Sequence, residues 1–213
     1  MFFTLGMNNS LFVCTTVGAT RYIDEWLEGI RLLNPSIIAI ARDLDRSEPL
    51  NPSDQYHVIN YRTNKAWKGY ELRHLDYESD YSIGLGIVKL MEFFLERNET
   101  HFIHIDSDVI ITEACAKKIY PLTWDNLTIV TPVIPRDRMD EPNIKPMWFW
   151  DSTNFGLRRE PLEKMFDDIK QILDDPHPID IKIHNVIRLH KPNSYREIRK
   201  GVYHYIKGEK TSL

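Results

Sequence analysis

The sequence contains, in the middle of the chain, the stretch His101-Phe102-Ile103-His104-Ile105-Asp106-Ser107-Asp108-Val109-Ile110-Ile111. An apolar run of strand length, rich in β-branched residues, stops at two carboxylates that one small residue separates. Buried parallel strands have this composition, and open α/β sheets bind ligands at the carboxyl ends of their strands. Because side chains alternate along an extended segment, we expect Asp106 and Asp108 to leave the chain on the same side.

The two aspartates are candidate ligands of a cation. Carboxylates held this close repel each other, and a shared proton or a bound cation relieves the repulsion. A hard divalent ion with oxygen ligands fits the pair, in particular one that also holds the phosphates of a substrate. The alternative is that one aspartate caps the next turn and the other is solvated, which is common for so short a pattern. The position at the end of a buried strand favours the ligand site.

The composition is that of an ordinary globular protein. The chain has 213 residues, 27% charged and 42% hydrophobic, so we expect one domain over residues 1–213 with a flexible lead at 1–9. A net charge of −4 argues against a general nucleic-acid binder. Cys14 and Cys115 lie in apolar surroundings, which favours buried thiols in a reducing compartment such as the cytoplasm. No apolar run has transmembrane length, so we expect no membrane span.

Patterns of strand and helix alternate along the chain. Hydrophobic runs predict strands at Leu11–Thr16, Ile37–Ala41, Tyr56–Tyr61 and Leu127–Pro132, with a short one around Tyr203–Tyr205. Helical spacing predicts helices over Tyr22–Leu33 with Thr20 as N-cap, Tyr81–Arg97, Thr112–Tyr120, and from Pro161 in a first turn to about Leu173. The polar stretch Arg62–Asp80 is interpreted as a surface loop. This order predicts an α/β sheet with helices on both faces.

The segment Phe102–Ile110 resembles the strand and the metal-binding Asp-x-Asp of GT-A fold glycosyltransferases, which use nucleotide-sugar donors. The likeness is closest to the retaining branch that includes glycogenin and the bacterial lipopolysaccharide galactosyltransferases. In that branch the motif follows a helix bearing a basic residue, which is Lys89 here. Near its C-terminus the branch has a histidine, an aromatic residue, a glycine and a lysine six residues after the histidine. The residues that resemble this element, with the glycine displaced by one, are His204, Tyr205, Gly208 and Lys210.

Two weaker likenesses lie between these elements. Ser152-Thr153-Asn154-Phe155-Gly156 resembles the Asn-x-Gly stretch that lines the sugar pocket of the branch. Asp180 and Asn185 resemble its Asp-Gln-Asp-x-x-Asn element, with Lys182 in place of the second aspartate. The resemblance implies a single GT-A (Rossmann-like) domain with a mixed central sheet flanked by helices, and an enzyme of hexosyltransferase type. The inverting branch of the same fold is still an alternative, because this sequence departs from the motifs of the retaining branch at the positions that would distinguish the two branches.

The resemblance also implies roles in binding the donor. Asp106, Asp108 and His204 would hold Mn²⁺ or Mg²⁺, and Lys210 would contact the diphosphate. Sugar transfer releases a charged nucleoside diphosphate, and a divalent ion stabilises the growing charge as a Lewis acid. Asp106 could also reach a ribose hydroxyl of the nucleotide. The remaining candidate nucleotide contacts are Thr15, Thr16, Asp43 and Lys89. For Asp43, a turn stabilised by its own backbone bonds is an equal alternative.

The catalytic candidates are Asp180, Asn154 and Asp151. An inverting transferase needs a carboxylate base facing the acceptor hydroxyl, and Asp151 or Asp180 would serve. A retaining enzyme needs only a polar group beside the anomeric carbon, and the resemblances at Asn154 and Asp180 favour retention. His101 and His104 are interpreted as structural histidines of the strand.

The sequence therefore predicts a metal-dependent glycosyltransferase that moves a sugar from a nucleotide-diphosphate sugar to an acceptor it does not identify, whether glycan, protein or lipid-linked. One alternative is a phosphatase or phosphotransferase of the haloacid dehalogenase type, whose nucleophile also lies in an Asp-x-Asp. That class places its motif early in the fold, whereas here a nucleotide-fold-like segment precedes it and Ile110 fills the expected Thr position. A nucleotide-binding module without catalysis is the second alternative.

Overall fold

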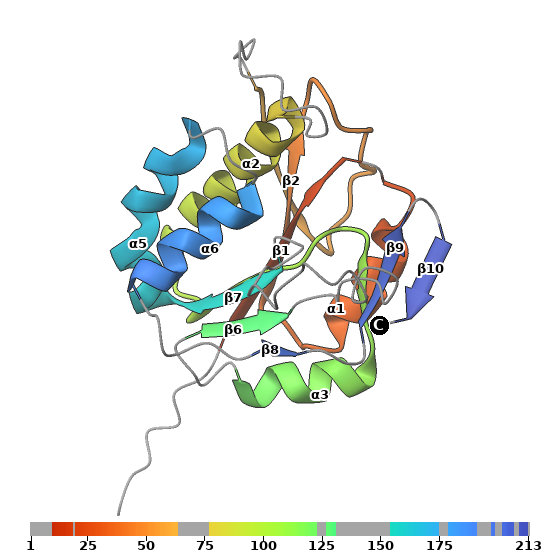
Figure 1. The fold of residues 1–213 in the computed structure, drawn as a ribbon. Coiled ribbons are helices and arrows are strands. Elements are labelled where there is room, and N and C mark those ends of the chain that lie inside the picture. Colours follow the sequence, from red (N-terminus) through yellow and green to blue (C-terminus); the bar gives the residue numbers. More distant parts are fainter. Residues whose placement is uncertain are drawn as a thin grey trace, which may run out of the picture.

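A central β-sheet with helices on its faces organises the computed structural model of the chain (Figure 1). The structure describes residues 10–18, 20–63, 77–122, 127–130, 154–174, 179–190, 197–198, 202–206 and 209–212. From residue 197 onward it describes the backbone. None of the helices in these ranges combines the length and the hydrophobicity of a membrane span.

The central sheet is mixed and has seven strands. Its members are β1 (Leu11–Val17), β2 (Ile37–Asp43), β3 (His57–Tyr61), β4 (His101–His104), β6 (Leu127–Val130), β7 (Phe155–Arg158) and β8 (Glu197–Ile198). They lie in the order β3-β2-β1-β4-β7-β6-β8. The first four of that order are parallel, β7 is antiparallel to both β4 and β6, and β8 is parallel to β6.

The strand order reverses direction beside β1. The chain runs from β1 outward to β2 and β3, and then returns to place β4 against the other edge of β1. In open α/β sheets such a reversal leaves a crevice at the carboxyl ends of the two strands that flank it, and ligands bind there. The carboxyl ends of β1 and β4 are therefore where this fold offers a site.

Helices cover both faces of the sheet, as Figure 1 shows. One apolar cluster joins the sheet to α2 (Tyr77–Leu95), α5 (Arg159–Gln171), the 3₁₀ helix η1 (Ile172–Asp174) and α6 (Ile179–His190). A second joins the opposite face to α1 (Ile23–Arg31) and α3 (Glu113–Leu122). Apolar residues of each helix belong to one of these two clusters, and α6 joins its cluster by packing on α2 and α5.

A small second sheet lies beside α1. Its strands are β5 (Val109–Ile111), β9 (Val202–Ile206) and β10 (Glu209–Ser212), in the order β10-β9-β5 and antiparallel throughout. The segment that the sequence shows as one apolar run is thus divided. β4 ends in the central sheet, and β5 begins in the second one after a short turn.

The predicted α/β class, with a mixed central sheet and flanking helices, is confirmed. The strands expected from hydrophobic runs are present within a few residues, and α5 has Pro161 in its first turn. Two boundaries were wrong. The hydroxyl of Thr20 donates to the Glu48 carboxylate (2.9 Å) and does not cap α1. Helix α2 begins at Tyr77, inside the stretch interpreted as a loop.

Arg159 ties the start of α5 to the end of α2. Its guanidinium donates to the backbone carbonyls of Phe94 (3.0 Å), Leu95 (3.4 Å), Arg97 (2.7 Å) and Glu99 (3.0 Å), and it lies 4.5 Å from the centroid of the Phe94 ring. The last carbonyls of a helix lack intrahelical donors and carry partial negative charge, so a cation there satisfies them and opposes the dipole.

Replacing Arg159 by alanine should lower the free energy of unfolding by about 2–4 kcal/mol, because it leaves several carbonyls without their donor. Urea denaturation measures the loss. Lys164→Ala is the matched control, since Lys164 pairs with Glu160 on the exposed face of the same helix and such pairs contribute less than about 1 kcal/mol. Equal losses in the two variants would contradict the role assigned to Arg159.

His101 is a buried histidine at the start of β4, as the sequence predicts for a structural residue. Its Nδ1 lies 2.8 Å from the Thr100 hydroxyl, and its Nε2 has no hydrogen-bond partner in the part of the chain described. Burial, and then the positive charge of Arg158, lower the pKa of His101 from 6.5 to about 4. The folded protein therefore holds this ring in its neutral form at neutral pH.

Between these two pKa values the unfolded chain binds a proton that the folded chain does not. The stability tied to His101 is therefore fully present above the unfolded pKa and is lost as the pH falls toward the folded one. We expect His101→Gln to remove about 2 kcal/mol of the wild-type loss in unfolding free energy between neutral pH and about pH 5. Urea denaturation at the two pH values measures this, and parallel pH profiles for the two proteins would show the expectation to be wrong.

Candidate functional site

The Asp106-Ser107-Asp108 motif lies in a turn at the end of β4. The backbone N–H of Ile105 donates to Cys14 in β1 (2.9 Å), which is the last bond of the parallel ladder, and the N–H of Val109 donates to the Asp106 carbonyl (3.0 Å). The expectation that the two aspartates lie on an extended segment was therefore wrong for the motif itself, because the chain turns there to leave the central sheet. Both aspartates are partly exposed at the carboxyl end of β4.

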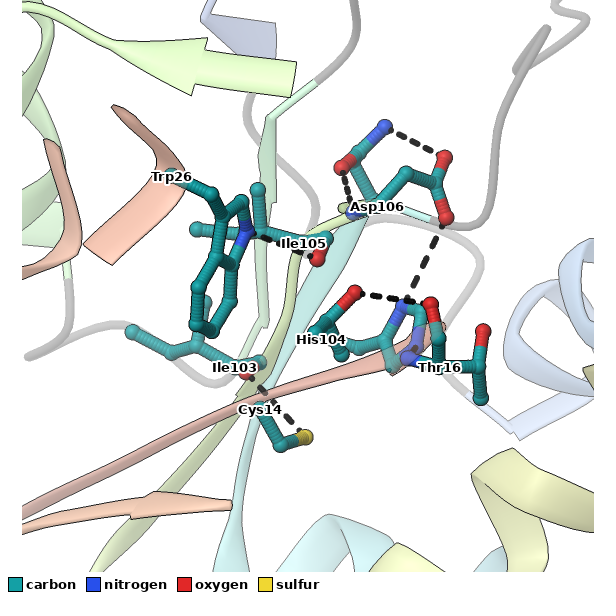
Figure 2. Close-up of polar contacts among 9 residues, drawn as sticks. Cys14, Thr16, Trp26, Ile103, His104, Ile105 and Asp106 are labelled. Carbon is teal, nitrogen blue, oxygen red and sulfur yellow. Dashed lines mark hydrogen bonds and ion pairs between the residues drawn. The ribbon is translucent and has the colours of Figure 1, made fainter. Parts of the chain in front are cut away.

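Helix α1 holds the backbone on both sides of this turn. The indole N–H of buried Trp26 donates to the Ile105 carbonyl (3.2 Å), just before Asp106 (Figure 2). On the far side, a Cβ added at Gly29 would lie 2.7 Å from the Ile111 carbonyl oxygen, so glycine allows α1 to pack directly on β5. The turn is thus held between two backbone positions that α1 fixes.

Asn154 binds Asp106 from the neighbouring strand. Its side-chain Oδ1 accepts from the backbone N–H of Asp106 (2.7 Å), and its Nδ2 donates to Oδ2 of the Asp106 carboxylate (2.9 Å). Asn154 is fully buried and directly precedes β7, which pairs with β4. A contact between Asn154 and a sugar remains a prediction, since both polar groups of its amide bind Asp106 in this structure.

His104, the last residue of β4, is fully buried and lies beside the end of β1 (Figure 2). Its Nε2 accepts from the backbone N–H of Thr16 (3.2 Å), so the neutral ring carries its proton on Nδ1. Nδ1 lies 3.9 Å from Oδ1 of Asp106, and the ring stacks on Phe155 with 5.9 Å between centroids. The structural role predicted for His104 is confirmed, and the ring also lies against the motif.

Strand β9 brings the C-terminal element beside the motif. In the antiparallel ladder with β5, the backbone of His204 is opposite Val109, the residue that follows Asp108. Lys210, on β10, is opposite Tyr205 of β9. The ladder thus places the backbone of the predicted third metal ligand next to the aspartates, while the side chains of His204 and Lys210 lie outside the described part.

Of the two predicted nucleotide contacts at the end of β1, Thr15 is buried and Thr16 is partly exposed. The Thr15 hydroxyl donates to the Thr16 carbonyl (3.1 Å). A Cβ added at Gly86 of α2 would lie 2.7 Å from both the Thr16 methyl group and the Tyr61 hydroxyl oxygen. Glycine at this position lets α2 approach the carboxyl ends of β1 and β3.

Asp43, at the end of β2, is buried within a polar network. One oxygen accepts from the backbone N–H of Asp45 (3.0 Å), and the other accepts from the hydroxyls of Ser82 (2.6 Å) and Thr63. Burial raises the pKa of Asp43, but these hydrogen bonds together outweigh it and hold the pKa below its usual value. The bond to Asp45 is the turn that the sequence offered as an equal alternative to nucleotide binding.

Lys89 lies on α2, one turn beyond Gly86. Its ammonium group pairs with Glu92 (2.7 Å), which also lies 4.0 Å from Lys170 of α5. The structure therefore describes Lys89 on a partly exposed face of helices α2 and α5. Its predicted contact with a nucleotide remains a prediction.

The catalytic candidates other than Asn154 are described in part. Asp151 lies outside the described residues, and for Asp180 the structure gives the backbone at the start of α6. Ile179 packs on α2, where a Cβ at Gly84 would lie 2.7 Å from its Cδ1, so the start of α6 lies against α2. Lys182 is buried and donates to the Leu173 carbonyl (3.1 Å), which gives a structural reason for a lysine at this position.

Sequence reasoning missed the polar partners of the site. The sequence places Trp26 in the helix predicted over Tyr22–Leu33 by the spacing of its apolar residues, and it singles out neither Ser82 nor Thr63. A buried tryptophan needs an acceptor for its N–H, so the helical stripe carried a general signal but did not identify Ile105 as the partner. Nothing in the local pattern around Ser82 or Thr63 points to Asp43.

The donor set at the turn fits a hard divalent cation. Asp106 and Asp108 offer carboxylate oxygens at a partly exposed turn, and the amide of Asn154 orients one carboxylate without cancelling its charge. Among the side chains that the structure describes, no three from His, Cys, Asp and Glu form a ligand set. A third protein ligand would therefore come from the undescribed side chains, as the prediction for His204 requires.

No protein-family model and no curated protein matches this sequence. Solved structures with a similar fold do exist. TarS from S. aureus, in its 1–349 form, superposes with a TM-score of 0.53 at 10% identity over 89% of this chain and 58% of that one. A candidate nucleotide-diphospho-sugar transferase from Desulfovibrio desulfuricans G20 superposes with a TM-score of 0.50 at 10% identity, over 89% of this chain and 79% of that one.

A second structure of S. aureus TarS has a TM-score of 0.54 at 12% identity, covering 89% of this chain and 35% of that one. The present chain thus spans only part of the length of TarS. At such low identity these superpositions show a shared fold, namely the mixed α/β sheet with flanking helices.

The contact between α1 and β5 predicts whether alanine at position 29 raises or lowers stability. Gly29→Ala should raise helix propensity by about 1 kcal/mol, yet the new Cβ meets the Ile111 backbone. We expect a net loss of about 1–3 kcal/mol in unfolding free energy, since the backbone must shift to accommodate the methyl group. Glu28→Ala, on the exposed face of the same helix, is the control and should change stability little. A stabilised Gly29→Ala variant in urea denaturation would show that α1 does not press on β5.

Proposed function

We propose that the protein is a metal-dependent glycosyltransferase that moves a sugar, of hexosyl type, from a nucleotide-diphosphate sugar to an acceptor. One observation carries this proposal. The Asp-x-Asp turn lies at the carboxyl end of β4, beside the point where the strand order reverses, and the carboxylate of Asp106 is oriented there by a buried amide. Sheets of this kind bind nucleotides at such a crevice, and paired carboxylates hold the cation that accompanies a diphosphate.

The ion would be Mn²⁺ or Mg²⁺, held by Asp106 and Asp108 with His204 as a third ligand. When bound, it would stabilise the negative charge that develops on the departing nucleoside diphosphate. The two carboxylates attract the cation and position it at the strand end. The pairing of β9 with β5 supports His204 as the third ligand, because it brings the backbone of that residue beside the motif.

The nucleotide would lie along the carboxyl ends of β1 and β2. Thr16 is partly exposed there and can meet a ligand, whereas Thr15 and Asp43 are buried. We propose that Thr15 and Asp43 support this surface by fixing the backbone and the hydroxyl groups around it. Lys89 and Lys210 remain the proposed cationic contacts, and Lys210 lies on β10, in the same small sheet as β5.

Retention of the anomeric configuration is the favoured outcome. It rests on the resemblances at Asn154 and Asp180, with Asp180 at the start of α6 as the polar group beside the anomeric carbon. If the enzyme inverts instead, Asp151 or Asp180 would act as the base for the acceptor hydroxyl. A cytoplasmic location is consistent with Cys14 and Cys115, which are both buried thiols.

The proposal is tested by donor hydrolysis and transfer with Mn²⁺. A panel of nucleotide-diphosphate sugars is incubated with the protein, and release of the nucleoside diphosphate is measured. Asp108→Asn should lower Mn²⁺ affinity by at least about tenfold and turnover with it, because it removes a ligand charge while keeping the side-chain shape. Asp167→Asn makes the same chemical change on the exposed face of α5 and should leave both quantities unchanged.

Full metal-dependent activity in Asp108→Asn would refute the metal site, and failure of every donor in the wild type would refute the transferase. The anomeric configuration of the product, read by NMR, then decides the stereochemistry. A retained product supports the roles of Asn154 and Asp180. An inverted product would transfer the role of base to Asp151 or Asp180.

A further inference from the structure

We propose that Asn154 is a positioning residue for Asp106, which selects the rotamer and the oxygen that the carboxylate presents to a divalent cation. The inference rests on the proposed function, since it gives the orientation of one of the two carboxylates a purpose. It assigns Asn154 an action through Asp106, separate from any contact with a sugar.

The geometry is that of a two-point clamp. Asn154 accepts from the backbone N–H of Asp106 (2.7 Å) and donates to Oδ2 of the same residue (2.9 Å), so one amide fixes both the backbone and the end of the side chain. Asn154 has no exposed surface, and strand β7, which begins at the next residue, pairs with β4 up to His104–Phe155. The clamp is therefore rigid, because the sheet itself holds it.

His104 bounds the other oxygen of the carboxylate. Its Nδ1 lies 3.9 Å from Oδ1 of Asp106, while Phe155 and the Thr16 N–H hold the ring in place. The two oxygens of Asp106 therefore have different surroundings, with a short bond from Asn154 at Oδ2 and a longer approach at Oδ1. The side chain of Asp106 is 22% exposed, which leaves the carboxylate accessible from outside.

The neutral amide of Asn154, as the hydrogen-bond donor to Asp106, also favours cation binding by this carboxylate. An arginine or lysine at this position would orient the carboxylate but would neutralise its charge. The amide of Asn154 is neutral, so it orients the group and leaves the negative charge to attract an ion. Hydrogen-bond partners that fix a metal ligand typically change metal affinity by about 10–100-fold when removed. A partner that served only folding would change stability and leave metal affinity alone.

The test compares two changes near the same strand. Mn²⁺ is titrated into the protein, and the free ion is followed by electron paramagnetic resonance in wild type, Asn154→Ala and Leu157→Ala. Leu157 is a buried apolar residue of β7 opposite Phe102, so its loss weakens the core without touching Asp106. We expect about tenfold weaker Mn²⁺ binding for Asn154→Ala. For Leu157→Ala we expect an unchanged affinity.

A second variant and a second measurement keep the test decisive. Asn154→Ser is used if the alanine variant does not fold. The serine hydroxyl can bond to only one of the two points on Asp106, so we expect an intermediate loss of Mn²⁺ affinity. A double-mutant cycle between Asn154→Ala and Asp106→Ala in urea needs no metal, and the two effects should not add.

The outcomes separate this inference from the proposed function. Wild-type protein that binds no Mn²⁺ overturns the metal site and with it the purpose given to Asn154. If the wild type binds Mn²⁺ and Asn154→Ala binds it equally well, the metal site stands and the positioning role is refuted. Equal losses of affinity in Asn154→Ala and Leu157→Ala also refute it, because they would reflect general damage to the strand. Additive effects in the urea cycle would refute the clamp itself.

Discussion

The exit of the chain from β4 is controlled by the backbone of Ile105, and the site depends on that control. The N–H of Ile105 completes the ladder with Cys14, and its carbonyl accepts the indole N–H of Trp26. Both groups are buried, so leaving either without a partner would destabilise the fold. Asp106 therefore begins at a position and in a direction that the two layers of the fold impose. The turn that follows carries the aspartates clear of the central sheet.

Buried polar groups on the other strands extend this control across the sheet. His104 links the end of β1 to Asp106, and Asn154 links the start of β7 to the same residue. All of these donors are neutral or backbone groups. A site built in this way holds its carboxylate in one orientation and keeps the charge that a cation requires. These side chains become ordered when the protein folds. Binding of a cation therefore costs little additional side-chain entropy.

The surface at the ends of β1 and β2 follows the same arrangement. Asp43 accepts from Ser82 and Thr63, and Gly86 lets α2 approach Thr16 closely. The hydrogen bonds keep Asp43 ionised in spite of its burial, and the network joins β2, α2 and the segment after β3. Polar residues near a strand end can thus build the wall of a site without touching its ligand.

The sequence by itself determined the α/β class, the end of β4 at the aspartates, α2 from Tyr81 onward and the strand around Tyr203–Tyr205. These features depend on the period of apolar residues and on local stop signals, which near neighbours along the chain decide. Only the tertiary structure decided that the Asp-x-Asp motif turns between two sheets, that Asn154 clamps Asp106, and that Trp26 supports Ile105. The partners in those contacts are 48 and 79 residues apart, so their meeting depends on strand order and on the packing of α1 across the sheet. No local pattern contains that information, because the reversal beside β1 is a property of the whole fold.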